Sequence, residues 1–185
     1  FTDRRQRQMC IRDRLKNLFV LAPAFFAGSF LVADVLKDSL LTFIIFSAAA
    51  STVYIFNDWI DRQADSKHPE KRTRPIASGQ ISEKIALMTG LLTLLMSMLM
   101  GLYFLNFEVI AITGSYLVLN LAYTLILKNI AILDVSCIAT GFVLRLFAGS
   151  EATGIELSSW IITLTFLPAL FLALAKRRDD CLLYT

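Results

Sequence analysis

The residues that decide the fold are LLTFIIFSAAASTVYIF (40–56) and the segment that follows without a break, NDWIDRQADSKHPEKRTRPIASG (57–79). The first segment has no charged residue and comes close to the roughly 20 apolar residues that an α-helix needs to cross a bilayer. The second segment is the most polar stretch of the chain and holds its only histidine, His68. This boundary predicts a membrane-spanning helix that ends in a polar segment at the membrane surface.

The rest of the chain repeats the apolar pattern. Hydrophobic residues make up 56% of the 185 residues, and the mean hydropathy is +0.63. A soluble domain of this size has too small an interior to bury that much apolar surface. Since no apolar stretch alternates with a period of two, the sequence predicts an all-α fold, a polytopic transmembrane helical bundle, in preference to a soluble one. The six predicted spans are residues 17–36, 40–56, 81–104, 109–127, 130–149 and 157–175.

Both ends of the chain depart from this pattern. Residues 1–14 and 181–185 resemble translated adapter sequence and are expected to be non-native, and the chain does not begin with Met. Residues 15–180 are expected to form one transmembrane domain that is part of a longer protein. The three cysteines have no paired spacing, so the sequence predicts neither a disulfide framework nor a cysteine metal site.

Lysine and arginine are distributed asymmetrically. If the spans alternate in direction, one side of the membrane receives the basic residues of the N-terminal segment and of residues 62–84, Lys128 and residues 176–178. The other side receives only Lys37. Because basic loops stay in the cytoplasm, we expect a multi-pass protein of the cell (plasma) membrane whose polar segment faces the cytoplasm. The net charge of +3 is small, and no nucleic-acid partner is expected.

Three acids recur along one face of the polar segment. If the helix continues to Asp65, the carboxylates of Asp58, Asp61 and Asp65 fall within about 60° of one another around its axis. Like charges on one face weaken a helix, and a bound divalent cation reverses that effect. Mg²⁺ prefers carboxylate and phosphate oxygens, and Asn57 adds an amide group at the membrane edge. The spacing predicts a Mg²⁺ site on the three acids.

A basic loop follows the acids. Its cations are Lys67, His68, Lys71, Arg72 and Arg74. Arginine binds phosphate as a fork and lysine binds it as a point charge, so bases beside acids suit a metal-bound polyanion such as diphosphate. The alternative is a solvated loop that only sets the topology. Since topology needs no acids, the acids favour a binding site.

These motifs resemble those of a known family. The pattern N-D-x-x-D-x-x-x-D at residues 57–65, followed by R-P and a turn of small residues and Gly, is similar to the UbiA-type intramembrane prenyltransferase superfamily. The run H-P-x-K-R-x-R-P-I-A at residues 68–77 resembles the decaprenyl-phosphate phosphoribosyltransferase branch. The resemblance extends through residues 123–149 and 158–180. It implies a bundle of nine spans, of which this chain would hold six.

The resemblance also implies a reaction. Enzymes of that branch transfer 5-phosphoribose from phosphoribosyl diphosphate to a polyprenyl (decaprenyl) phosphate and release diphosphate, with Mg²⁺ on acidic motifs. The catalytic and metal-binding residues would be Asp58, Asp61 and Asp65. A homo-oligomer is compatible with this resemblance. The substrate-binding residues that it implies, together with those of the loop, are Asn57, Lys67, His68, Lys71, Arg72, Arg74, Asn120, Tyr123, Lys128, Asp134, Lys176, Arg177 and Asp179.

Structural roles compete for some of these residues. Lys128 suits an interfacial lysine whose stem is buried and whose amine reaches water. Asp134 suits a first-turn acid that interacts with the helix dipole. Asn120 and Tyr123 suit hydrogen bonds between helices. For Arg145, which lies inside a predicted span, we favour a structural role through Glu151 or backbone carbonyls.

Two other functions are compatible with the sequence. An enzyme with the same acidic face could move a polyprenyl group from a prenyl diphosphate to an aromatic acceptor. A non-enzymatic transporter or scaffold could use the polar loop to bind anions. Transport would be favoured by inverted repeats or a helix broken in the membrane, and Pro168 is the nearest sign of such a break.

Overall fold

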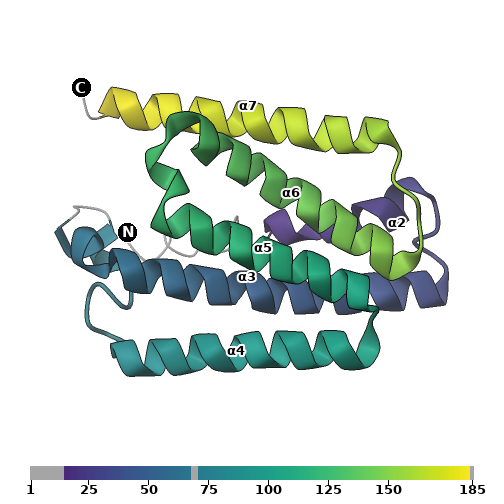
Figure 1. Ribbon diagram of the computed structural model, residues 1–185, viewed down its shortest axis with the longest axis horizontal. Helices are drawn as coiled ribbons and strands as arrows, with labels where there is room; N and C mark the ends of the chain where they lie inside the picture. Colours follow the sequence, from purple (N-terminus) through teal and green to yellow (C-terminus); the bar gives the residue numbers. More distant parts are fainter. Residues whose placement is uncertain (1–14, 68–70, 184–185) are drawn as a thin grey trace.

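The computed structural model describes residues 15–67 and 71–183, and the side chains of 129, 131 and 179–183 are left out of the description. These residues form helices, with no strand among them, as Figure 1 shows. The predicted all-helical bundle is confirmed for this part of the chain. In chain order, the elements are η1 (Lys16–Leu21), α2 (Ala22–Phe26), α3 (Ala33–Lys67), η2 (Lys71–Thr73), α4 (Glu83–Phe104), α5 (Phe107–Leu125), η3 (Leu127–Asn129), α6 (Ala131–Thr153) and α7 (Ser159–Leu183).

Five of these helices, α3 to α7, are long and apolar enough to cross a membrane. The predicted span at 17–36 is wrong as a single helix, because η1 and α2 together cover only Lys16–Phe26. Gly28, with a φ of +68°, ends α2. Its N–H donates to the Phe25 carbonyl, and the N–H of Ser29 donates to the Ala24 carbonyl. These two hydrogen bonds are the pair that defines a Schellman cap. The chain then turns and enters α3.

Helix α3 is much longer than a bilayer requires. Its 35 residues extend roughly 52 Å at 1.5 Å per residue, against a hydrocarbon core of about 30 Å. The apolar part ends at Phe56, and the helix continues without a break through Asp65 to Lys67. The acidic stretch of the sequence therefore lies on a helical extension beyond the apolar part of the bundle.

Helices α3 and α4 pack through small and polar side chains. The Ser97 hydroxyl donates to the Ile45 carbonyl across the interface at 2.9 Å, and the hydroxyls of Thr52 and Thr93 are 3.0 Å apart. A Cβ atom added to Gly90 would lie 3.3 Å from the Ile55 side chain, so the glycine permits the close approach. Such contacts are the usual means of helix association in membranes, where the hydrophobic effect does not distinguish lipid from protein.

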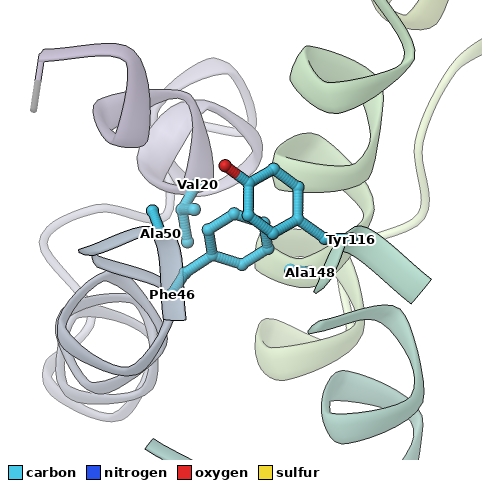
Figure 2. Packing of buried hydrophobic residues seen from close by; sticks show 5 residues of the cluster. All are labelled: Val20, Phe46, Ala50, Tyr116 and Ala148. Carbon is cyan, nitrogen blue, oxygen red and sulfur yellow. The ribbon is translucent and has the colours of Figure 1, made fainter. Parts of the chain in front are cut away.

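The buried core connects the N-terminal segment to the bundle. Figure 2 shows its five fully buried members, with the rings of Phe46 and Tyr116 against each other at a centroid distance of 4.6 Å. They come from four elements, and they are Val20 of η1, Phe46 and Ala50 of α3, Tyr116 of α5 and Ala148 of α6. Residues distant in sequence thus fix η1 against three long helices.

A charged residue lies beside this core. Arg145 is only 4% exposed, and its guanidinium donates to the Asn17 side-chain oxygen at 3.0 Å, the Tyr116 hydroxyl at 3.0 Å and the Gly141 carbonyl at 2.6 Å. A backbone carbonyl is therefore one of its partners, as predicted, whereas Glu151 is exposed and is not among them. The aromatic rings within 5.5 Å of its guanidinium carbon are those of Phe46, Tyr116 and Phe142.

The polar segments gather at one end of the bundle. In Figure 1 the C-terminal end of α3, the start of α4, the turn between α5 and α6 and the C-terminal end of α7 all lie on the left. Helix α7 passes through Pro168 as one continuous element, so this proline does not break the helix. The residues that sequence analysis selects therefore come from separate parts of the chain to the same end of the molecule.

Candidate active site

The loop between α3 and α4 folds back toward the acids of α3. After η2, the N–H of Ser78 donates to the Arg74 carbonyl, and the N–H of Ile81 donates to the Pro75 carbonyl. Gly79, with a φ of +76°, allows the tight turn that these bonds close. Ser82 then caps α4 by accepting from the N–H of Ile85. The compact turn places Arg74 beside the last turns of α3.

Arg74 connects two of the predicted acids. Its Nη1 atom donates to Oδ1 of Asp58 and to Oδ2 of Asp65, each at 2.8 Å. Since one nitrogen reaches both, the two carboxylate oxygens are no more than 5.6 Å apart, twice the single distance. The continuous helix thus presents Asp58 and Asp65 on the same face, and the loop supplies a cation to it.

The third acid of this face reaches a different element. Nζ of Lys128, in η3, lies 2.6 Å from Oδ1 of Asp61. Both side chains are about seven-tenths buried, with 31% and 27% of their surface exposed. Lys128 is therefore in direct contact with the acidic face of α3, and its amine is not simply turned toward solvent.

A further ion pair joins α6 and α7. The guanidinium of Arg177 donates to Oδ2 of Asp134 in the first turn of α6, and the Tyr123 side chain of α5 lies beside the same carboxylate. The structure therefore brings together Tyr123, Asp134 and Arg177, each of which the family resemblance implied as a substrate-binding residue. These ion pairs bring together four carboxylates and three cations, and they join α3 to its loop, α3 to η3, and α6 to α7.

The residues present suit a metal ion that is bound together with phosphate. Among the described residues, no three His, Cys, Asp or Glu side chains converge into a site that could hold an ion alone. Mg²⁺ in phosphate-transfer sites needs only one or two carboxylates, because phosphate oxygens and water complete its shell. Two buried oxygens here, Oδ1 of Asn57 and Oδ1 of Asp134, have no hydrogen-bond partner. Both are oxygen ligands of the type that Mg²⁺ prefers.

Other predicted residues lie away from these pairs. The Asn120 amide donates to the Tyr116 carbonyl of its own helix at 2.8 Å, so this contact is not the predicted bond between helices. Lys67, Lys71, Arg72 and Lys176 have exposed side chains. His68 and the side chain of Asp179 lie outside the described residues. The exposed cations border the site and do not take part in its ion pairs among described residues.

Sequence reasoning missed one cluster at this end of the bundle. Glu83, the first residue of α4, accepts from the Trp59 indole N–H at 3.0 Å and from Nε of Arg62 at 2.8 Å. Arg62 also covers the Trp59 ring, with 5.3 Å from its guanidinium carbon to the ring centroid. We call these three residues the α3–α4 clamp. The signal for this contact in the sequence was that a basic residue, Arg62, and an acidic residue, Glu83, flank the loop between α3 and α4.

Curated proteins similar to this chain include two enzymes named decaprenyl-phosphate phosphoribosyltransferase. The one from Corynebacterium glutamicum is 35% identical over 92% of this chain and 52% of its own length. The one from Mycolicibacterium smegmatis is 36% identical over 90% of this chain and 53% of its own length. A protein from Azorhizobium caulinodans named nodulation protein NoeC is 31% identical over 90% of this chain and 53% of its own length. The chain thus spans about half the length of the curated relatives it matches.

A solved structure has the same fold. It is a UbiA homolog from Archaeoglobus fulgidus bound to DMAPP and Mg²⁺, with a TM-score of 0.68 over 88% of this chain and 58% of that one, at 22% identity. The family model for the UbiA prenyltransferase family matches residues 18–182. That match includes the α3 extension, its loop and the end of α7. On these findings, the chain belongs to the UbiA prenyltransferase family.

Proposed function

We propose that this chain forms the diphosphate-binding part of a membrane phosphoribosyltransferase. The enzyme would transfer 5-phosphoribose from phosphoribosyl diphosphate to a polyprenyl phosphate such as decaprenyl phosphate. The observation that carries the proposal is the set of carboxylates and cations at one end of the bundle, where Arg74 and Lys128 contact Asp58, Asp61 and Asp65. The names of the two phosphoribosyltransferase relatives support the choice of donor and acceptor.

The location of this site suits a reaction between a water-soluble donor and a lipid. The acids lie on the extension of α3 beyond its apolar part, so they are placed near the membrane surface. A polyprenyl phosphate holds its chain in the bilayer and its phosphate at that surface. The site would face the cytoplasm of a cell membrane, in keeping with the excess of Lys and Arg at this end.

The chemistry requires charge stabilisation more than proton transfer. An oxygen of the acceptor phosphate bonds to C1 of the ribose, and the bond from C1 to the diphosphate oxygen breaks with its electron pair on the diphosphate. The acceptor is already anionic and needs no general base. Arg74 and Lys128, which contact the acids of the site, would stabilise the negative charge on the leaving diphosphate. Mg²⁺, when bound through the acids, would supply further charge to the same oxygens.

We expect the exposed basic residues of the loop to distinguish this donor from a prenyl diphosphate. Phosphoribosyl diphosphate carries a second phosphate, on the 5-position of its ribose, and Lys71 and Arg72 are exposed beside the acidic site. We expect Lys71→Ala or Arg72→Ala to weaken phosphoribosyl diphosphate binding about ten- to a hundred-fold, because a charge-assisted hydrogen bond is lost. Binding of inorganic diphosphate should change much less. Lys84→Ala, at an exposed lysine of α4, is the matched control.

The test is a titration of the purified variants with both ligands in Mg²⁺, alongside a transfer assay with labelled phosphoribosyl diphosphate and polyprenyl phosphate. Labelled lipid that forms only with Mg²⁺ would support the proposal. Equal weakening for both ligands, or tighter binding of a prenyl diphosphate by the parent protein, would favour prenyl transfer to an aromatic acceptor. The absence of binding to either class of diphosphate would favour the transporter or scaffold.

A further inference from the structure

We propose that Arg74 and Lys128 are resident counter-ions, which hold the acids in the ligand-free protein and move to phosphate oxygens when metal and diphosphate bind. The inference rests on the proposed function only in using a metal-bound diphosphate as the ligand. It predicts that metal ion and diphosphate each bind weakly alone and strongly together. The three acids of the α3 face are already paired, with Arg74 on Asp58 and Asp65 and Lys128 on Asp61.

The two acids that Arg74 contacts differ in burial. The Asp65 side chain is 5% exposed, whereas those of Asp58 and Arg74 are each 32% exposed. A buried carboxylate that loses a paired cation is strongly destabilised, so Arg74 should keep Asp65 and release Asp58. Asp65 is then a positioning residue for Arg74, and Asp58 and Asp61 are the acids available to a metal.

The charges explain why neither ligand suffices alone. A divalent ion that takes Asp58 and Asp61 displaces Arg74 and Lys128 from their carboxylates, and these two cations then lie beside the added positive charge. Diphosphate alone is attracted by Arg74 and Lys128, but it must displace the carboxylates with which both cations are already paired, and those carboxylates then repel it. When both ligands arrive, the metal satisfies the acids and the phosphate oxygens satisfy the displaced cations.

The direct test measures Mn²⁺, an EPR-visible substitute for Mg²⁺, with and without inorganic diphosphate. We expect Arg74→Gln to bind Mn²⁺ alone about three- to ten-fold more tightly than the parent, because a competitor for Asp58 is gone. In the presence of diphosphate, the same variant should bind about ten- to a hundred-fold more weakly, because a charge-assisted bond to phosphate is lost. Opposite effects on Mn²⁺ affinity without and with diphosphate would show that Arg74 moves from the carboxylate to the phosphate.

The matched control is Arg62→Gln. Arg62 lies on the same helix near the same membrane face, but its partner is Glu83 and not an acid of the site. The substitution removes the same charge, so it reproduces any general electrostatic effect on metal or diphosphate. We expect both affinities to stay within about twofold of the parent. If Arg74→Gln binds Mn²⁺ alone no better than Arg62→Gln does, the resident counter-ion is refuted.

A second variant covers the case in which Arg74→Gln does not fold because Asp65 is left unpaired. The double variant Asp65→Asn, Arg74→Gln removes both members of the buried pair and leaves the net charge unchanged. It should still bind Mn²⁺ alone more tightly than the parent. Weaker binding would make Asp65 a metal ligand and overturn its positioning role. These titrations use inorganic diphosphate, so they remain valid even if the donor proves to be a prenyl diphosphate.

Discussion

Replacing Gly149 with alanine tests how η1 is held against the bundle. A Cβ atom at Gly149 would lie 1.9 Å from the Val20 carbonyl oxygen and 2.9 Å from its carbonyl carbon. Real Cβ atoms essentially never approach another atom within 3.0 Å, so η1 and α6 must separate by at least about 1.1 Å. The neighbour is backbone, which cannot rotate away as a side chain would. The substitution should therefore displace η1 as a unit.

The displacement has a calculable consequence. Overpacking costs about 1–3 kcal/mol, and a movement of this size also stretches the 3.0 Å bond from Arg145 to Asn17, whose loss costs about 1.5–3 kcal/mol. Alanine is favoured over glycine in a helix by about 0.5–1 kcal/mol, which offsets part of the loss. The expected net decrease in the free energy of unfolding is about 1.5–5.5 kcal/mol.

The assay is reversible unfolding of the purified protein in mixed micelles, followed by far-UV circular dichroism. Gly114→Ala is the control, because nothing lies within 4 Å of the Cβ that it would add on α5. That variant should be as stable as the parent or slightly more so. If Gly149→Ala is as stable as Gly114→Ala, the close approach between η1 and α6 is not what holds the N-terminal segment.

Two further predictions concern the acids and the buried arginine. Asp58→Asn or Asp61→Asn should abolish transferase activity while insertion into membranes is preserved. Asp34→Asn, at an exposed acid at the opposite end of α3, should leave activity intact. Parent-level activity in both site variants would contradict the metal assignment. Asn17→Ala removes an acceptor from the buried Arg145 guanidinium and should lower the free energy of unfolding by about 1.5–3 kcal/mol, measured in the same micelles.

The spans could be predicted because hydropathy along one segment decides whether it crosses a membrane. The predicted first span failed at Gly28, where a left-handed residue ends α2, since an average over 20 residues does not register one backbone angle. The continuation of α3 to Asp65, which the predicted face of acids assumed, is observed in the structure. Such features are local, because the residues of the segment itself decide them.

The partners of charged residues could not be predicted in the same way. Arg145 contacts Tyr116 and Asn17, which are 29 and 128 residues away, and not the nearby Glu151 that the sequence suggested. Lys128 contacts Asp61 across 67 residues. These pairs depend on which helix faces which, and a single sequence has no signal for that. The family resemblance implied that Lys128 binds substrate, but it did not show that Asp61 is its partner.

The uninterrupted length of α3 has a consequence for the lipid environment. Asp58 follows the fully buried Phe46 by twelve residues, so roughly 18 Å of rigid helix separates the core from the first acid of the site. Half of a typical hydrocarbon layer is about 15 Å thick. With Phe46 at the midplane, the acids lie about 3 Å beyond that half-layer, so a hydrocarbon layer about 6 Å thicker would bring them to the level of the acyl chains. A thinner layer would raise them further from the lipid phosphates. Since a helix of this kind responds to mismatch by tilting or by deforming the bilayer, reconstitution in lipids of graded acyl-chain length should give an activity optimum.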